Sequence, residues 1–126
     1  MKAKCTDWMG RPYPLTSILA GVGPGWGHLV CRLIRDLFAL GWDGELHQIK
    51  EKFGGLRFYI GAGTDEIFDR IHKAESESYK ICYQCGEPGK ERPSGWIMVL
   101  CDSCWEEEQK RQDYAEDVDI GPTSLL

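Results

Sequence analysis

Between His28 and Leu40 the apolar residues recur at the spacing of an α-helix. Their side chains would share one face, with charged residues on the opposite face. Gly41 follows directly and suits the C′ position that ends a helix. The pattern predicts an amphipathic helix over residues 27–40. Its apolar positions are Leu29, Leu33, Ile34, Leu37, Phe38 and Leu40.

The next segment, residues 45–60, alternates apolar and polar positions as a half-buried β-strand pair does. Its Gly54–Gly55 dipeptide suits the positive φ angles of a type I′ turn. We therefore expect a β-hairpin in which Phe53 faces Leu56 across the two strands. In that register Glu51 lies on the apolar face, and we expect a bulge or a strand edge to accommodate it. The apolar positions of this face are Ile49, Phe53, Leu56, Phe58 and Ile60.

A second helix is predicted over residues 65–79. Thr64 is a suitable N-cap, and Asp65 and Glu66 place negative charge at the positive end of the helix dipole. Helix, hairpin and helix together predict an α+β fold for residues 1–80. The chain then divides into a cysteine module over 81–116 and an acidic, disordered tail over 117–126.

Four of the six cysteines form two CxxC pairs, and fifteen residues separate the pairs. Thiolates bind zinc well, and two intervening residues let one tight turn present both sulfurs to the same ion. Four thiolates complete a tetrahedral coordination sphere and leave no position for water or substrate. The spacing predicts one structural Zn²⁺ ion per chain. Its ligands are Cys82, Cys85, Cys101 and Cys104.

The surroundings of the cysteines predict a specific arrangement. Gly86 follows the first pair as in a zinc knuckle, residues 96–100 form an apolar strand, and a helical pattern begins at the second pair. In this order residues Cys82–Tyr114 resemble a zinc finger of the treble-clef or zinc-ribbon type. The resemblance implies a structural zinc ion. It leaves the function open, because such fingers serve as nucleic-acid readers, as protein-binding modules and as structural supports.

A wider resemblance covers roughly Gly23 to Cys104. It rests on GPGW before the first helix, KEKFGGLRFY in the hairpin, and a cysteine pair followed by GW and a further LC. These motifs resemble a group of small, largely uncharacterised bacterial and phage-borne proteins. The resemblance implies a shared fold and a bacterial or viral origin, and it carries no activity with it.

The chain contains no apolar run of the ~18 residues that span a bilayer. Its first residues, MKAKCTDWMGRPYP, lack the apolar stretch of a secretory signal. We therefore expect a cytoplasmic protein, bacterial or, if phage-encoded, in the host cytoplasm. Thiols stay reduced there, which favours metal ligation over disulfide formation.

The net charge of −5 is unevenly distributed. From Trp105 to Leu126 the chain has seven acidic residues and only two basic ones, so the remaining residues carry equal numbers of each. Broad electrostatic attraction to nucleic acid is not expected from such a chain. The excess negative charge instead lies entirely in this C-terminal segment.

These observations favour a non-enzymatic, zinc-stabilised protein-binding module, an adaptor or an inhibitor. The predicted zinc is closed, and the acidic segment offers a surface for a basic partner. A phage protein of this kind can occupy the basic groove of a host defence or nucleic-acid enzyme. The predicted contact residues are Trp105, Glu106, Glu107, Asp113 and Asp117, with Trp8 and Trp96 as further exposed candidates.

Two alternatives remain open. The hairpin face with Lys50, Lys52, Arg57 and Tyr59 would serve a nucleic-acid-binding protein, which the acidic helix disfavours if it lies nearby. A small enzyme would use a His47/Glu51 pair. The glycine-rich segments GVGPGWG and GAGTDE lack the lysine or G-x-G-x-x-G frame of phosphate loops and are interpreted as turns.

Overall fold

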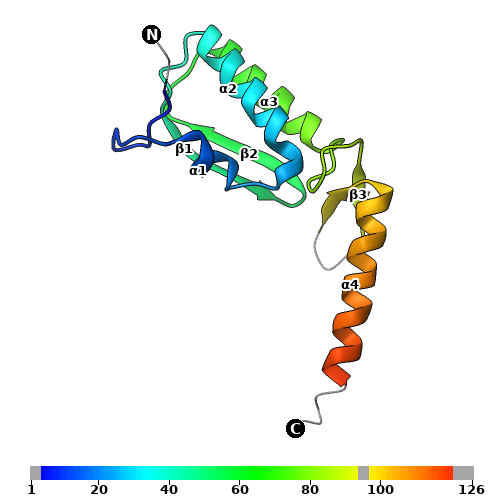
Figure 1. Ribbon diagram of the computed structural model, residues 1–126. Helices are drawn as coiled ribbons and strands as arrows, with labels where there is room; N and C mark the ends of the chain where they lie inside the picture. Colours follow the sequence, from blue (N-terminus) through cyan, green and yellow to red (C-terminus); the bar gives the residue numbers. More distant parts are fainter. Residues whose placement is uncertain (1–3, 94–96, 121–126) are drawn as a thin grey trace.

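The computed structural model describes residues 4–93 and 97–120, with side chains up to Arg111 (Figure 1). It confirms the α+β class and the predicted order of helix, hairpin, helix and cysteine module. The elements are α1 (Leu15–Leu19), the 3₁₀ helix η1 (Pro24–Trp26), α2 (Gly27–Ala39), β1 (Leu46–Lys52), β2 (Gly55–Ile60), α3 (Asp65–Ser78), β3 (Lys90–Arg92), β4 (Met98–Leu100) and α4 (Asp102–Ile120).

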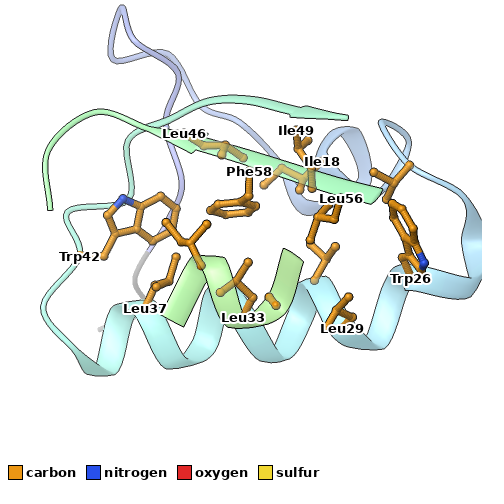
Figure 2. Packing of buried hydrophobic residues seen from close by; sticks show 14 of the residues in the cluster. Ile18, Trp26, Leu29, Leu33, Leu37, Trp42, Leu46, Ile49, Leu56 and Phe58 are labelled. Carbon is orange, nitrogen blue, oxygen red and sulfur yellow. The ribbon is translucent and has the colours of Figure 1, made fainter. Parts of the chain in front are cut away.

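The hydrophobic core lies between helices α2 and α3 and the β1–β2 hairpin. Figure 2 shows Leu33 and Leu37 of α2 pointing toward Phe58 of the hairpin, with Trp42 at one end of the core and Trp26 at the other. Each of these side chains is at most 4% exposed. Complete burial of such a side chain contributes about 1.5–3 kcal/mol, so this layer is the main source of stability for the body of the fold.

Helix α3 also covers the outer edge of β2. The Ser78 hydroxyl accepts a hydrogen bond from the Leu56 backbone N–H at 2.9 Å, and a Glu75 carboxylate oxygen accepts one from Phe58 at 3.1 Å. An uncovered strand edge invites pairing with another chain. Side chains from α3 satisfy this edge and fix the helix against the strand.

The predicted register of the hairpin is wrong by two residues. Leu56 lies opposite Glu51 and not opposite Phe53, and the turn is formed by Phe53 and Gly54, whose φ angles are 52° and 89°. Gly55 is the first residue of β2, and it is glycine for a packing reason, because an added Cβ would lie 2.3 Å from the ring of Tyr79. Only one of the two glycines thus serves the turn, and Phe53 is 69% exposed rather than part of the core.

Glu51 has a local function that differs from the expected bulge or strand edge. Its carboxylate accepts a hydrogen bond from the Gly54 backbone N–H at 2.7 Å, so it caps the turn from within β1. The bulge lies at the other end of the strand, where the register shifts between Leu46 and Gln48.

The C-terminal part consists of a short antiparallel pair, β3 and β4, followed by α4. Figure 1 shows α4 running away from the body of the molecule. It continues to Ile120, four residues into the segment that we predicted as a tail, and residues 121–126 lie outside the described part of the chain. None of the described helices combines the length and apolar character needed to cross a membrane.

Candidate metal centre

The four predicted cysteine ligands converge at one point. The sulfurs of Cys82, Cys85, Cys101 and Cys104 all lie within 4.8 Å of one another. The sulfurs of Cys85 and Cys101 are 3.6 Å apart. Zinc–sulfur bonds of about 2.3 Å place tetrahedral ligands roughly 3.8 Å apart. The cluster therefore has the dimensions of a metal site and can hold one ion.

Each CxxC pair uses the same local geometry. The Cys85 backbone N–H points to the sulfur of Cys82, and the Cys104 backbone N–H points to the sulfur of Cys101, both at 3.4 Å. Gly86 completes the first turn with a φ of 86°, where its N–H bonds the Cys82 carbonyl at 3.0 Å. Donors directed at sulfur favour its thiolate form, which is the form that binds metal.

The cysteines also influence one another's ionisation. Burial raises the pKa of Cys82, but backbone hydrogen bonds from Cys85, Cys101 and Gln84 outweigh it and lower the pKa to about 6. Burial and the neighbouring cysteines raise the pKa of Cys104. One thiolate thus forms readily, and its negative charge opposes ionisation of the neighbouring thiols. Four thiolates at this distance therefore need a cation among them. This donor set fits a soft divalent ion such as Zn²⁺.

Arg92 positions the second cysteine pair. Its guanidinium donates to the Leu100 carbonyl at 3.0 Å and to the Asp102 carboxylate at 2.7 Å, and its side chain lies 5.9 Å from the centre of the Trp105 ring. These contacts tie β3 to the start of α4 on both sides of Cys101. Sequence reasoning missed Arg92, because its partners depend on the β3–β4 pairing.

The GPGW motif packs directly against the first cysteine pair. The Gly25 N–H bonds the Tyr83 carbonyl at 2.8 Å, and the Trp26 indole N–H bonds the Ile81 carbonyl at 3.1 Å. The Trp26 and Tyr83 rings meet edge to face, with their centres 4.7 Å apart. The segment is therefore more than the turn we expected, because it joins the helical body to the metal centre.

The glycines of this motif are required by close approach. A Cβ on Gly25 would lie 2.0 Å from the Cys82 carbonyl oxygen, and one on Gly23 would lie 2.4 Å from the Tyr83 carbonyl oxygen. Real Cβ atoms do not come this close to backbone atoms, so only glycine fits at either position. The high glycine content of GVGPGWG indicates a close backbone approach, but the sequence alone does not identify the segment that these glycines contact.

The predicted partner-binding residues lie along or near the start of α4. Glu106 and Glu107 are exposed, whereas Trp105 is half-buried beneath Arg92. The side chains of Asp113 and Asp117 lie outside the described part of the chain, as does Trp96. Trp8 is 65% exposed in the N-terminal segment.

The hairpin contains the residues of both alternative functions, the nucleic-acid-binding face and the His47/Glu51 pair. Lys50, Lys52, Arg57 and Tyr59 belong to the hairpin, and all are at least partly exposed. His47 does not pair with Glu51, since its Nε2 lies 2.6 Å from a carboxylate oxygen of Glu45 and Glu51 caps the turn. The bulge after Leu46 breaks the alternation on which the expected His47/Glu51 pair depended.

Comparison with known proteins gave no match to a family model, to a curated protein or to a solved structure. The cysteine cluster agrees with a zinc-finger-like module. The wider resemblance to bacterial and phage-borne proteins stays a prediction.

Proposed function

We propose that this chain is a non-catalytic protein-binding module, an adaptor or an inhibitor, held together by one structural Zn²⁺ ion. The observation that carries the proposal is the convergence of four cysteine sulfurs within 4.8 Å of one another. Four thiolate ligands close the sphere of a tetrahedral zinc ion, so the ion would stabilise structure without meeting a substrate. In small modules the free energy of zinc binding is folding free energy, on the order of 10 kcal/mol.

The geometry of α4 supports a role for this helix in binding the partner, and we call its exposed acidic start, with Glu106 and Glu107, the contact arm. A helix gains most of its stability in proteins from packing an apolar face. This helix extends over 19 residues, runs away from the body, and exposes Glu106 and Glu107 near its start. A partner with a basic surface would complement that charge and be drawn to it electrostatically. The basic nucleic-acid groove of a bacterial host enzyme has the required chemistry.

A capture experiment tests the contact arm. The full zinc-loaded chain is tagged and used to capture proteins from nuclease-treated bacterial lysate at 50 and 300 mM salt. We expect Glu106→Gln/Glu107→Gln to weaken capture of the retained partner at least threefold at low salt. The effect should be smaller at high salt, because screening already weakens exposed charges.

The matched control is Asp69→Asn/Glu91→Gln, which removes the same charge from two exposed positions outside α4. It should leave capture unchanged, and zinc content and circular dichroism should be the same in all variants. Equal capture by the two double variants and the original chain would show that the acids of α4 only keep the protein in solution.

A further inference from the structure

The outward face of the β1–β2 hairpin concentrates positive charge. The register places Lys50 directly opposite Arg57 and Gln48 opposite Tyr59, while Ile49 and Phe58 face the core. Like charges opposite each other on a sheet destabilise it. Within residues 4–93 and 97–111, the structure pairs none of Lys50, Lys52 and Arg57 with a carboxylate in a salt bridge. In the described part of the chain, no salt bridge therefore neutralises the positive charge of this face.

Arg57 is held in place on this face. Its guanidinium donates to the Leu56 carbonyl at 2.8 Å and to the Tyr79 hydroxyl at 3.3 Å. The hydrogen bond to Tyr79 and, to a lesser degree, the charge of Glu75 raise the pKa of the Arg57 guanidinium, and a carboxylate oxygen of Glu75 also accepts the Phe58 N–H. A fixed guanidinium with N–H groups to spare is suited to a phosphate oxygen.

Two exposed aromatic rings adjoin these cations. Phe53, at the tip of the hairpin, is 69% exposed, and Tyr59 is 39% exposed. The Lys52 ammonium lies 5.7 Å from the centre of the Phe53 ring, which places that ring beside the charged face. Phe53 also has a φ of 52°, a left-handed conformation that is costly for a bulky residue. Neither burial nor turn preference accounts for a phenylalanine at this position.

We propose that this face, formed by Lys50, Lys52, Phe53, Arg57 and Tyr59, binds single-stranded nucleic acid. The cations contact phosphates, while the rings of Phe53 and Tyr59 stack on unpaired bases. The objection that the acidic helix would repel phosphate is reduced, because α4 runs away from the hairpin (Figure 1). This binding is separate from the protein contact proposed for α4, and neither proposal depends on the other.

The test uses the full zinc-loaded chain and a fluorescein-labelled 12-mer of oligothymidylate, followed by fluorescence anisotropy from 25 to 200 mM salt. An abasic 12-mer with the same number of phosphates is measured in parallel. We expect saturable binding of the thymidylate and at least fivefold weaker binding of the abasic strand, since stacking contributes about 1–3 kcal/mol per base. Three phosphate contacts predict a slope of log K against log salt of roughly −2.

Two variants locate the site. Phe53→Asn removes a ring and suits the turn, so it should weaken thymidylate binding at least fivefold without lowering the melting temperature. Lys50→Gln/Lys52→Gln should bring the salt slope toward zero by about 1.4. The matched control, Arg32→Gln/Arg35→Gln, changes net charge equally at two exposed positions of α2 and should leave the affinity within twofold.

Three results would overturn the proposal. The first is no binding of the thymidylate at 25 mM salt with 100 μM protein. The second is equal binding of the abasic strand, which would indicate a general polyanion contact without stacking. The third is an equal loss of affinity in the lysine variant and in the arginine control, which would indicate overall charge rather than this face.

Discussion

Gly25, in the middle of η1, is required by a close backbone approach. Its Cα lies against the backbone of the first CxxC turn, and an added Cβ would come within 2.0 Å of the Cys82 carbonyl oxygen and 2.5 Å of the Gly86 nitrogen. Both contacts are with backbone atoms, which cannot rotate away as a side chain does. The residue thus controls how closely the helical body approaches the metal centre.

We predict that Gly25→Ala lowers the free energy of unfolding by about 1–3 kcal/mol, the usual cost of forcing extra volume into a packed site. It should also speed release of zinc to a chelator, because the first cysteine turn must shift. Thermal melting and a colorimetric zinc-release assay measure the two effects.

Gly27→Ala is the control for this substitution. Gly27 opens α2, and an added Cβ there meets nothing within 4 Å. Alanine is favoured over glycine in helices by roughly 0.5–1 kcal/mol, so this variant should be as stable as the original chain or slightly more stable. Equal behaviour of the two variants would contradict the role given to Gly25.

At the scale of elements, periodicity was enough to predict α2, α3 and the existence of the hairpin, because each buries one face. The register of the hairpin was not predictable from local sequence. The ring of Tyr79 occupies the space beside Gly55, so glycine is required there by packing and not by the turn. The positive φ angles of the turn belong to Phe53 and Gly54.

At the metal centre, too, local features were predictable from the sequence and long-range contacts were not. The ligands follow from CxxC spacing, since two cysteines in one tight turn are local neighbours. The supporting contacts of Gly25, Trp26 and Arg92 join segments that are far apart in the chain or depend on strand pairing, and no local pattern predicts them.

The strained turn leads to a prediction about stability. Asparagine adopts the left-handed conformation more readily than phenylalanine and is favoured before glycine in type I′ turns. We therefore expect Phe53→Asn to increase the free energy of unfolding by roughly 1 kcal/mol, as measured by urea denaturation. Phe53→Ala removes the same ring without suiting the turn and should bring no such gain. A less stable Phe53→Asn chain would show that the exposed ring contributes to folding.

At the scale of the whole molecule, Trp26 joins the metal centre to the hydrophobic core. Trp26 closes an end of the core, and its indole N–H bonds the Ile81 carbonyl directly before the first cysteine. Its ring also meets Tyr83, which lies between Cys82 and Cys85. Loss of the metal should therefore alter one end of the core while the other end, at Trp42, keeps its packing against Phe38 and Phe58.

This coupling can be measured by ¹⁹F NMR of the chain labelled with 5-fluorotryptophan, with the Trp26 and Trp42 signals assigned from Trp→Phe variants. We expect removal of zinc by a chelator to shift or broaden the Trp26 signal and to leave the Trp42 signal in place.

Cys82→Ser should produce the same spectrum without chelator, because three thiolates hold the ion less firmly. Cys31→Ser changes a half-buried cysteine of α2 outside the cluster and should keep both the zinc and the original spectrum. An unchanged Trp26 signal in the metal-free chain would mean that the body holds this end of the core without the metal centre, and that the contacts of Gly25 and Trp26 persist on an unligated cysteine turn.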